Sequence, residues 1–172
     1  MEEMLNGLLQ LSRTGRVVMN IVQVPMRDLI VKVIQSADHQ LHEISSEIII
    51  GDLPDCYGDE NMLNQLFSNL ISNAIKYRHP DRKLKITLDG IMRYRKVQFR
   101  VQDNGIGIAK MHIDKIWQVF FRVDNKQLPG DGVGLSVVKR IIEKHKGKIW
   151  VESTELVGSA FFIELPVEAF SE

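Results

Sequence analysis

Two glycine clusters carry the clearest chemical signal in this sequence. The first is Asp103-Asn104-Gly105-Ile106-Gly107-Ile108, and the second is Gly130-Asp131-Gly132-Val133-Gly134-Leu135. Glycine has no Cβ and tolerates positive φ, so backbone N–H groups in such clusters can come close to phosphate oxygens. The second cluster runs directly into a helical pattern over 136–144, and a helix N-terminus favours bound anions. Together the clusters predict one nucleotide, bound from two sides.

The residues around the first cluster narrow the kind of nucleotide site. Val97, Phe99 and Val101 alternate in a strand pattern, and Asp103 places a carboxylate at the end of that strand. A dinucleotide fingerprint needs a helix straight after its glycines, and a Walker A loop needs Gly-Lys followed by Ser or Thr. Neither pattern is present in the sequence. A different nucleotide-binding fold is therefore expected.

A third feature lies on a helix predicted over 60–77, with Asp59 as its N-cap. Asn69, Asn73 and Lys76 fall within roughly 60° of one another, beside the apolar face of this helix. A single asparagine inside a helix is usually just solvated. Two amides aligned with an ammonium favour a role in holding Mg²⁺ and phosphate, because Mg²⁺ accepts neutral amide oxygens and completes its shell with water and phosphate oxygens.

Composition limits the class of protein and its partners. The 172 residues are 44% hydrophobic and 26% charged, enough for one domain with a core of its own. Lysine plus arginine equals aspartate plus glutamate at 22 each, so no bulk charge favours nucleic acid or a membrane surface. The single cysteine, Cys56, excludes an internal disulfide. A cytoplasmic location is expected, although a cytosolic fragment of a membrane receptor would have the same composition.

The pattern of apolar and turn residues predicts the elements that must position these groups. Helices are expected over 2–13, 26–43, 60–77, 112–119 and from the second cluster to 146. Strands are expected over 17–22, 47–50, 84–88, 97–102, 148–152 and 160–165. Turns are expected around Asp89-Gly90 and through Val157-Gly158-Ser159, and residues 121–131 are expected to form a mobile flap.

The N-terminal apolar stripe has two open interpretations, and the histidines, the cysteine and Trp150 are mostly expected to have no role in the site. The apolar stripe Met4, Leu5, Leu8 and Leu11 either packs on its own domain or ends a longer helix of a dimerising hairpin. His39, His42, His112 and His145 show no metal-like clustering and are expected at the surface or at helix ends. His79 follows the 60–77 helix, and a contact with phosphate is the alternative to an unremarkable role there. Cys56 is expected to be structural and Trp150 to lie in the core.

Four segments in a fixed order resemble the sequence boxes of sensor histidine kinase catalytic domains. They are 69–77 for the N box, 103–107 for the G1 box, 117–122 for the F box and 130–135 for the G2 box. Residues 139–145 and 147–153 look like the last helix and strand of that family. Residues 8–13 resemble the end of the second helix of its dimerisation and phosphotransfer hairpin, which favours the truncated-hairpin interpretation of the N-terminal stripe.

The resemblance implies the Bergerat ATP-binding fold, an α/β two-layer sandwich of a mixed sheet and helices. Residues 1–16 would end the hairpin, and residues 17–172 would form the catalytic domain. The implied function is transfer of the ATP γ-phosphoryl to a histidine on a hairpin that this chain lacks, so the chain alone is not expected to label itself. Implied partners are the parent's own hairpin, in a homodimer, and a response regulator. ATP and Mg²⁺ are the implied cofactors.

The resemblance also assigns roles to single residues. Asn73 would hold Mg²⁺, with Asn69 and Lys76 near the phosphates, and Arg122 would reach the γ-phosphate. Asp103 would accept a hydrogen bond from the adenine amino group, and a buried carboxylate repels the carbonyl that guanine carries there. The implied nucleotide contacts are Asn69, Asn73, Lys76, Tyr77, Asp103, Gly105, Ile106, Gly107, Ile108, Phe120, Gly130, Gly132, Val133, Gly134 and Leu135.

The sequence departs from the family pattern at two positions and leaves two alternatives. Trp117 replaces the usual first phenylalanine of the F box, and Asp131 replaces a small polar residue in the second cluster.

One alternative function is that of a hydrolysing member of the superfamily, of the gyrase or Hsp90 kind. Those enzymes carry a glutamate base four residues before the magnesium asparagine, where this chain has Asn69, and an amide cannot take a proton from water. The other is a nucleotide-binding module of a degenerate kinase.

Overall fold

The computed structural model describes residues 18–122 and 132–169. The helix predicted over 2–13, the proposed hairpin end at 1–16 and the flap beyond Arg122 lie outside these residues. None of the helices in the described part of the chain is long and apolar enough to cross a bilayer.

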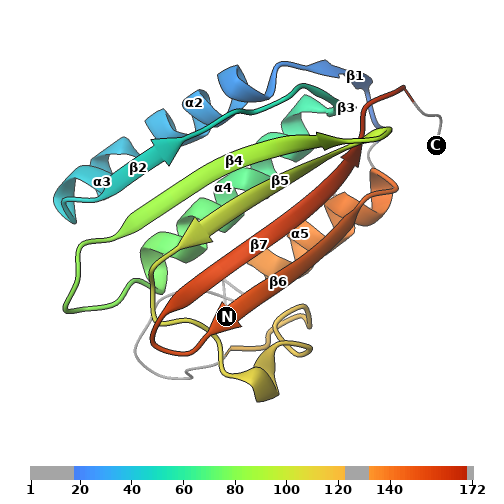
Figure 1. Cartoon of the computed structure of the whole chain (residues 1–172). Coiled ribbons are helices and arrows are strands. Elements are labelled where there is room, and N and C mark those ends of the chain that lie inside the picture. Colours follow the sequence, from blue (N-terminus) through green and yellow to red (C-terminus); the bar gives the residue numbers. More distant parts are fainter. Residues whose placement is uncertain (1–17, 123–131, 170–172) are drawn as a thin grey trace.

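A five-stranded mixed sheet forms one layer (Figure 1). Its strands, in spatial order, are β2 (Glu47–Ile50), β4 (Lys85–Arg93), β5 (Lys96–Asp103), β7 (Gly158–Pro166) and β6 (Lys148–Thr154). The β2–β4 pair is parallel, and the other pairs are antiparallel. A small antiparallel pair, β1 (Ile21–Val24) and β3 (Cys56–Asp59), stands apart from this sheet.

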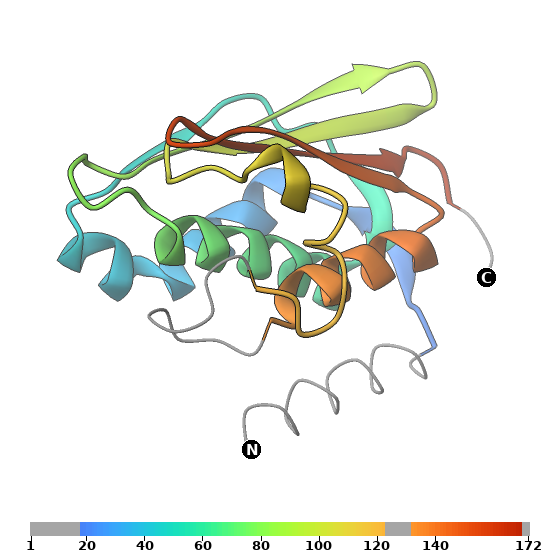
Figure 2. The ribbon, with the colours of Figure 1, turned by 90° about the horizontal axis from the view of Figure 1, so that it is seen from below.

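In the described part of the chain, the helices lie on one face of the sheet (Figure 2). They are α2 (Met26–Ser36), α3 (Asp38–Glu43), α4 (Glu60–Lys76) and α5 (Gly134–Lys144), and a short 3₁₀ helix, η1, spans Lys110–His112. Between the layers, the edge of the Phe67 ring on α4 meets the Phe99 ring on β5, with centroids 5.9 Å apart. This arrangement is the α/β two-layer sandwich that the resemblance implies.

No described helix covers the other, open face of the sheet, and this corrects the prediction for Trp150. Phe161, Ile163 and Leu165 on β7 point toward the helices and are buried. Phe162 must then face the opposite side, because side chains alternate along a strand. Trp150 pairs with Phe162 across β6 and β7, and their rings stack with centroids 5.2 Å apart. Trp150 is therefore half-buried on the open face rather than in the core.

The turn predicted around Asp89-Gly90 is also wrong, because β4 continues through it to Arg93 and the turn falls at Tyr94-Arg95. Gly90 is a packing residue: a Cβ there would lie 2.8 Å from the Phe99 ring of the neighbouring strand. A glycine in a strand therefore marks a close approach here, not a turn.

Other boundaries shift for local reasons. The helix predicted over 26–43 is divided at Ala37, and the one predicted over 112–119 is replaced by η1 and turns. The strand predicted over 17–22 is shifted along the chain, since β1 begins at Ile21 and ends at Val24. Its partner β3 was missed, because four residues ending in Gly-Asp carry little periodicity. The turn between β6 and β7 falls at 155–157.

Cys56 on β3 is buried, and this burial raises the pKa of its thiol to about 12. The thiol is therefore unreactive, and the residue has a structural role.

Asp59 joins three elements at the start of α4. Its Oδ1 accepts from the Met62 N–H at 3.0 Å, which confirms the predicted N-cap, and its Oδ2 accepts from the Asn20 N–H at 2.9 Å. Its own N–H donates to His145 Nε2 at 3.0 Å. His145 is the C-cap of α5 and is fully buried, so the helix-end alternative predicted for it is confirmed and the surface alternative is not. Gly58 leaves room for the His145 ring, because a Cβ at position 58 would lie 2.9 Å from that ring.

His145 makes stability dependent on pH. Its Nδ1 donates to the Ile141 carbonyl at 2.7 Å and its Nε2 accepts, which is the neutral tautomer, and burial lowers its pKa below the usual 6.5. The unfolded chain therefore binds a proton that the folded chain does not, and stability is lost as pH falls below about 6.5. We expect His145→Gln to lower the free energy of unfolding by roughly 1–3 kcal/mol near neutral pH. Urea unfolding at about pH 7.5 and about pH 5 should show a smaller pH dependence in this variant than in wild type.

The exposed His42 supplies the matched control for this measurement. His42→Gln should change the stability near neutral pH little, because the contact of His42 with Asp38 is exposed to solvent. If His145→Gln unfolds with the wild-type pH dependence, the buried imidazole is not the titrating group.

Candidate nucleotide-binding site

A cleft of two joined hollows lies between the end of α4, the first glycine cluster and the start of α5. Both hollows are lined by Asn73, Tyr77, Ile116, Phe121 and Leu135. The inner hollow is also lined by Asp103, Ile106, Gly107, Ile108, Arg122, Ser159 and Phe161. The outer one is also lined by Asn69, Ser72, Lys76, Gly132 and Gly134. Segments far apart in sequence, including most of the predicted site, therefore meet in one cleft.

The inner hollow suits a flat base. It is narrow, about 70 Å³, and mainly apolar. Its one carboxylate among the described lining residues, Asp103, is half-buried and accepts from the Gly105 N–H at 2.8 Å. Burial raises the Asp103 pKa, while backbone hydrogen bonds from Gly105 and Ser159 oppose that shift. A partly desolvated carboxylate of this kind is stabilised by a further donor from a ligand.

The outer hollow suits a hydrated, charged group. It is wider, about 190 Å³, and more polar. Asn69, Asn73 and Lys76 project into it from α4, half-buried at the margin of the core as their helical spacing predicts. Asn69 Nδ2 donates to the Gly134 carbonyl at 3.4 Å, so α4 is linked to the start of α5. The Lys76 ammonium lies 4.9 Å from the centroid of the Tyr77 ring.

Gly105 and Gly107 of the first cluster have different surroundings from Gly134 of the second. A Cβ at Gly105 would overlap the Tyr77 carbonyl oxygen, and one at Gly107, where φ is +68°, would overlap the Thr154 carbonyl oxygen. These two glycines therefore pack their loop against the protein's own backbone. A Cβ at Gly134 would meet nothing nearer than Asn69 at 3.9 Å, so this backbone has open space in front of it. The structure therefore shows a packing role for these two glycines, and the approach of their backbone to a nucleotide stays a prediction.

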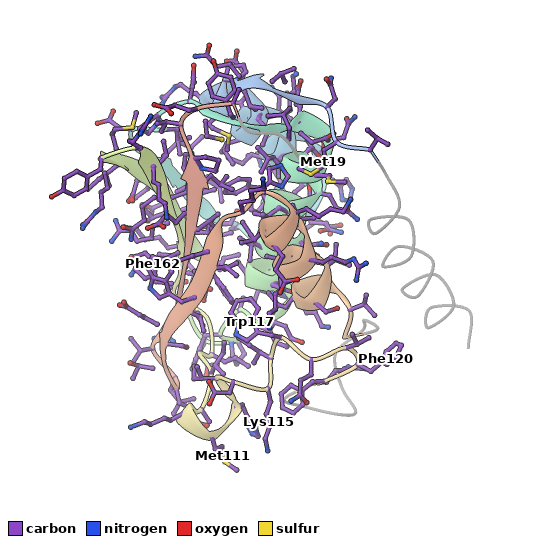
Figure 3. All side chains as sticks on the ribbon, turned by 90° about the vertical axis from the view of Figure 1, so that its right-hand side faces the viewer. Met19, Met111, Lys115, Trp117, Phe120 and Phe162 are labelled. Carbon is purple, nitrogen blue, oxygen red and sulfur yellow. The ribbon has the colours of Figure 1, made fainter. Side chains whose placement is uncertain are left out.

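A few predicted residues lie away from the cleft. Gly105, Phe120 and Val133 are not among its lining residues, since Gly105 packs on Tyr77 and Val133 is in the core. Gly130 and Asp131 lie outside the described residues. Phe120 is at the outer edge of the view in Figure 3, whereas Trp117 is turned inward, edge-on to Phe161 at 6.1 Å. That contact holds Trp117 against β7.

Five lining residues of the cleft were missed by the sequence analysis: Ser72, Ile116, Phe121, Ser159 and Phe161. Ser159 is brought beside Asp103 by the register of β5 and β7, which pairs the two residues. That register depends on long-range pairing and has no local signature. Phe121 lies next to the predicted Phe120, and only the turn there, where Phe120 has φ of +65°, decides which ring faces the cleft.

A larger hollow, about 920 Å³, lies on the other side of Asp103, between residues 110–114 and the adjoining ends of β6 and β7. It is wide open to solvent, so it would exclude little water from a ligand. The enclosed cleft is the better candidate.

This fold and this site define a class of ATP-binding proteins. The family model described as histidine kinase-, DNA gyrase B- and HSP90-like ATPase matches residues 58–169, and the chain belongs to this family. Within it, the similar proteins described next place the chain with the ATP-binding catalytic domains of sensor histidine kinases.

Two curated relatives illustrate the similarity. Cyanobacterial phytochrome B of a Nostoc species is 36% identical over 96% of this chain and 22% of its own length. The sensor protein kinase WalK of Staphylococcus saprophyticus is 36% identical over 77% of this chain and 21% of its own length. The chain thus spans about a fifth of the length of the curated relatives it matches.

Two solved structures share the fold. Full-length ShkA in complex with AMPPNP superposes with a TM-score of 0.83 and 25% identity, covering 98% of this chain and 36% of that one. A nucleotide-free catalytic domain of the histidine kinase ThkA superposes with a TM-score of 0.75 and 27% identity, covering 87% of this chain and 99% of that one.

The different roles of the glycines can be tested by adding a Cβ. Gly107→Ala combines positive φ with an overlap on the Thr154 carbonyl, so we expect the free energy of unfolding to fall by roughly 1–3 kcal/mol. Gly134→Ala, at the first position of α5 with open space, should leave stability unchanged or raise it by up to about 1 kcal/mol. Urea unfolding of both variants without nucleotide measures the difference. Equal effects would contradict the packing role of Gly107.

Proposed function

We propose that this chain binds Mg-ATP in the cleft and passes the γ-phosphoryl group to a histidine on a dimerisation hairpin. The observation that carries the proposal is the placement of Asp103 and Asn73 in one cleft, with the more polar hollow extending from Asn73 along α4. A nucleotide needs this combination of a base-binding carboxylate and a polar site for its phosphates.

Adenine is the base that fits the inner hollow best. The Asp103 carboxylate accepts a hydrogen bond from the amino group of adenine and repels the carbonyl of guanine. Ile106, Ile108 and Phe161 supply apolar surface for the faces of the ring, and Tyr77 lies beside them. The hydrogen bond from adenine offsets the desolvation that raises the pKa of Asp103.

The outer hollow fits a magnesium ion with its phosphates. Asn73 supplies the neutral amide oxygen for Mg²⁺, which takes its remaining ligands from water and phosphate. When bound, the ion neutralises charge on the phosphates.

Further residues of the cleft orient and neutralise the phosphates. The Lys76 ammonium and the Asn69 amide lie along α4 beside Asn73, and the backbone of Gly132 and Gly134 leads into the N-terminus of α5. Arg122 lines the inner hollow and not the outer one, so its expected reach to the γ-phosphoryl group stays a prediction. Phosphoryl transfer depends mainly on such positioning and charge stabilisation.

None of the described lining residues places a carboxylate at the phosphate end of the cleft, and this favours transfer over hydrolysis. Among the described lining residues, Asp103 is the one carboxylate, and it belongs to the base end. The position four residues before Asn73 holds Asn69, which cannot act as a general base for water. A degenerate, non-catalytic module is disfavoured because Asn73, Lys76 and Arg122 all line the cleft.

Partners and location follow from the same proposal. Residues 1–16 are proposed to end the hairpin helix, and the parent is proposed to act as a cytoplasmic-facing homodimer that passes its phosphoryl group to a response regulator. The bound nucleotide analogue named for ShkA supports ATP as the ligand of this fold.

The base preference can be measured by calorimetry on this chain with magnesium. ATP and ADP should bind, and GTP should bind at least tenfold more weakly, a difference of about 1.4 kcal/mol. Asp103→Asn should lose roughly 1.5–3 kcal/mol of ATP affinity, because it removes the charged acceptor and presents a donor to the adenine amino group. GTP binding as strong as ATP binding would contradict the assignment of adenine as the bound base.

The transfer reaction can be measured with γ-labelled ATP and a supplied hairpin from the parent protein. We expect acid-labile, base-stable label on the hairpin histidine and none on this chain. Asn73→Ala should abolish both transfer and the magnesium dependence of nucleotide binding. Its folding should change little, because Asn73 is only half-buried at the margin of the core. Release of free phosphate without hairpin labelling would favour the hydrolysing alternative.

A further inference from the structure

Arg82 bridges two loops that are distant in sequence. It lies in the connection between α4 and β4, and its guanidinium Nη2 donates to the Gly105 carbonyl at 2.9 Å and to the Leu156 carbonyl at 2.5 Å. Gly105 belongs to the first glycine cluster, and Leu156 belongs to the turn between β6 and β7. Figure 2 shows the connection after α4 and this turn on the same side of the molecule.

Backbone hydrogen bonds join the same three segments. The Ile106 N–H donates to the Tyr77 carbonyl at 2.9 Å, and the Leu156 N–H donates to the Ile106 carbonyl at 2.6 Å. The Asn104 side chain adds two bonds to the α4–β4 connection: Oδ1 accepts from the Lys85 N–H at 2.8 Å, and Nδ2 donates to the Lys83 carbonyl at 3.0 Å. The glycine loop is thus held between the end of α4 and the β6–β7 turn.

This loop needs external fixation, because it carries the base-binding surface but little side-chain bulk of its own. Asp103, Ile106 and Ile108 line the inner hollow, and they are separated by Gly105 and Gly107. Glycine has the largest conformational freedom to lose on ordering. A charged donor shared by two carbonyls, one of them within the loop, restricts that freedom more strongly than a neutral hydrogen bond does.

We propose that Arg82 is a positioning residue for the adenine side of the cleft. Arg82 does not itself line either hollow, so it acts on the ligand through Gly105 and Leu156. The inference rests on the proposed function only in taking ATP and ADP as the ligands. Its direct consequence is that base binding depends on Arg82, while the magnesium and phosphate contacts along α4 do not.

The experiment compares Arg82→Ala with Lys83→Ala, a neighbouring exposed residue whose loss changes the net charge equally. Calorimetry with magnesium should show that Arg82→Ala weakens ADP and ATP by the same factor, about tenfold. Lys83→Ala should bind as wild type does. Arg82→Lys should fall between, since an ammonium carries the charge without the rigid guanidinium geometry. The magnesium dependence of binding should be unchanged in all three variants.

Amide hydrogen exchange supplies a second readout. Without nucleotide, the Ile106 and Leu156 amides should exchange faster in Arg82→Ala than in wild type and Lys83→Ala, while the α4 amides remain unchanged. In the hairpin assay, Arg82→Ala should raise the KM for ATP and leave kcat unchanged.

Each failure has a separate meaning. Wild-type protein that binds no ATP would overturn the proposed function. Wild-type binding with unchanged affinity in Arg82→Ala would overturn the positioning role alone, as would an equal loss in Lys83→Ala. If Arg82→Ala fails to fold, Arg82→Lys decides: wild-type affinity and wild-type Ile106 exchange would overturn the inference.

Discussion

The site depends on α4 being held at both ends. At its N-terminus, the Asp59 carboxylate caps the helix and binds the Asn20 N–H before β1, while the Asp59 N–H binds the buried His145 at the end of α5. At its C-terminus, the Tyr77 carbonyl accepts from the Ile106 N–H of the glycine loop. The helix that carries the phosphate-side residues is thereby fixed relative to both glycine segments.

Between these ends, α4 serves the core and the ligand at once. Its buried face, including Leu63, Phe67 and Leu70, packs against the inner side of the sheet. Burial of such a face determines the rotation of the helix about its axis, because turning it would expose apolar surface to water. Asn69, Asn73 and Lys76 are then left at the margin, half-buried and facing the cleft. Packing of the apolar face of α4 therefore orients these three polar side chains toward the cleft, although they contribute little to the core.

Most of the fold and much of the site could be predicted from local pattern. The 3.6-residue period of α4, its Asp59 cap and the alternation of β5 are visible in the sequence because each depends on neighbours within a few residues. The mixed sheet and the helical layer were predicted from the family resemblance, which rests on the order of the four boxes. The failures came where a local feature has a distant cause: Gly90 stays in a strand because of Phe99, and His145 is buried because Gly58 makes room for it.

The sequence by itself determined the chemistry available here: two amides and an ammonium on one stripe of a helix, a carboxylate at the end of a strand, and glycines on both sides of a variable segment. Only the tertiary structure decided which groups meet. The register of β5 and β7 sets Ser159 beside Asp103, the contact of Gly107 with Thr154 makes that glycine a packing residue, and Arg82 reaches Gly105 and Leu156 across the fold. The physical reason is range: propensity and periodicity act over one or two turns, whereas these contacts exist only after distant strands have paired and α4 has packed on the sheet.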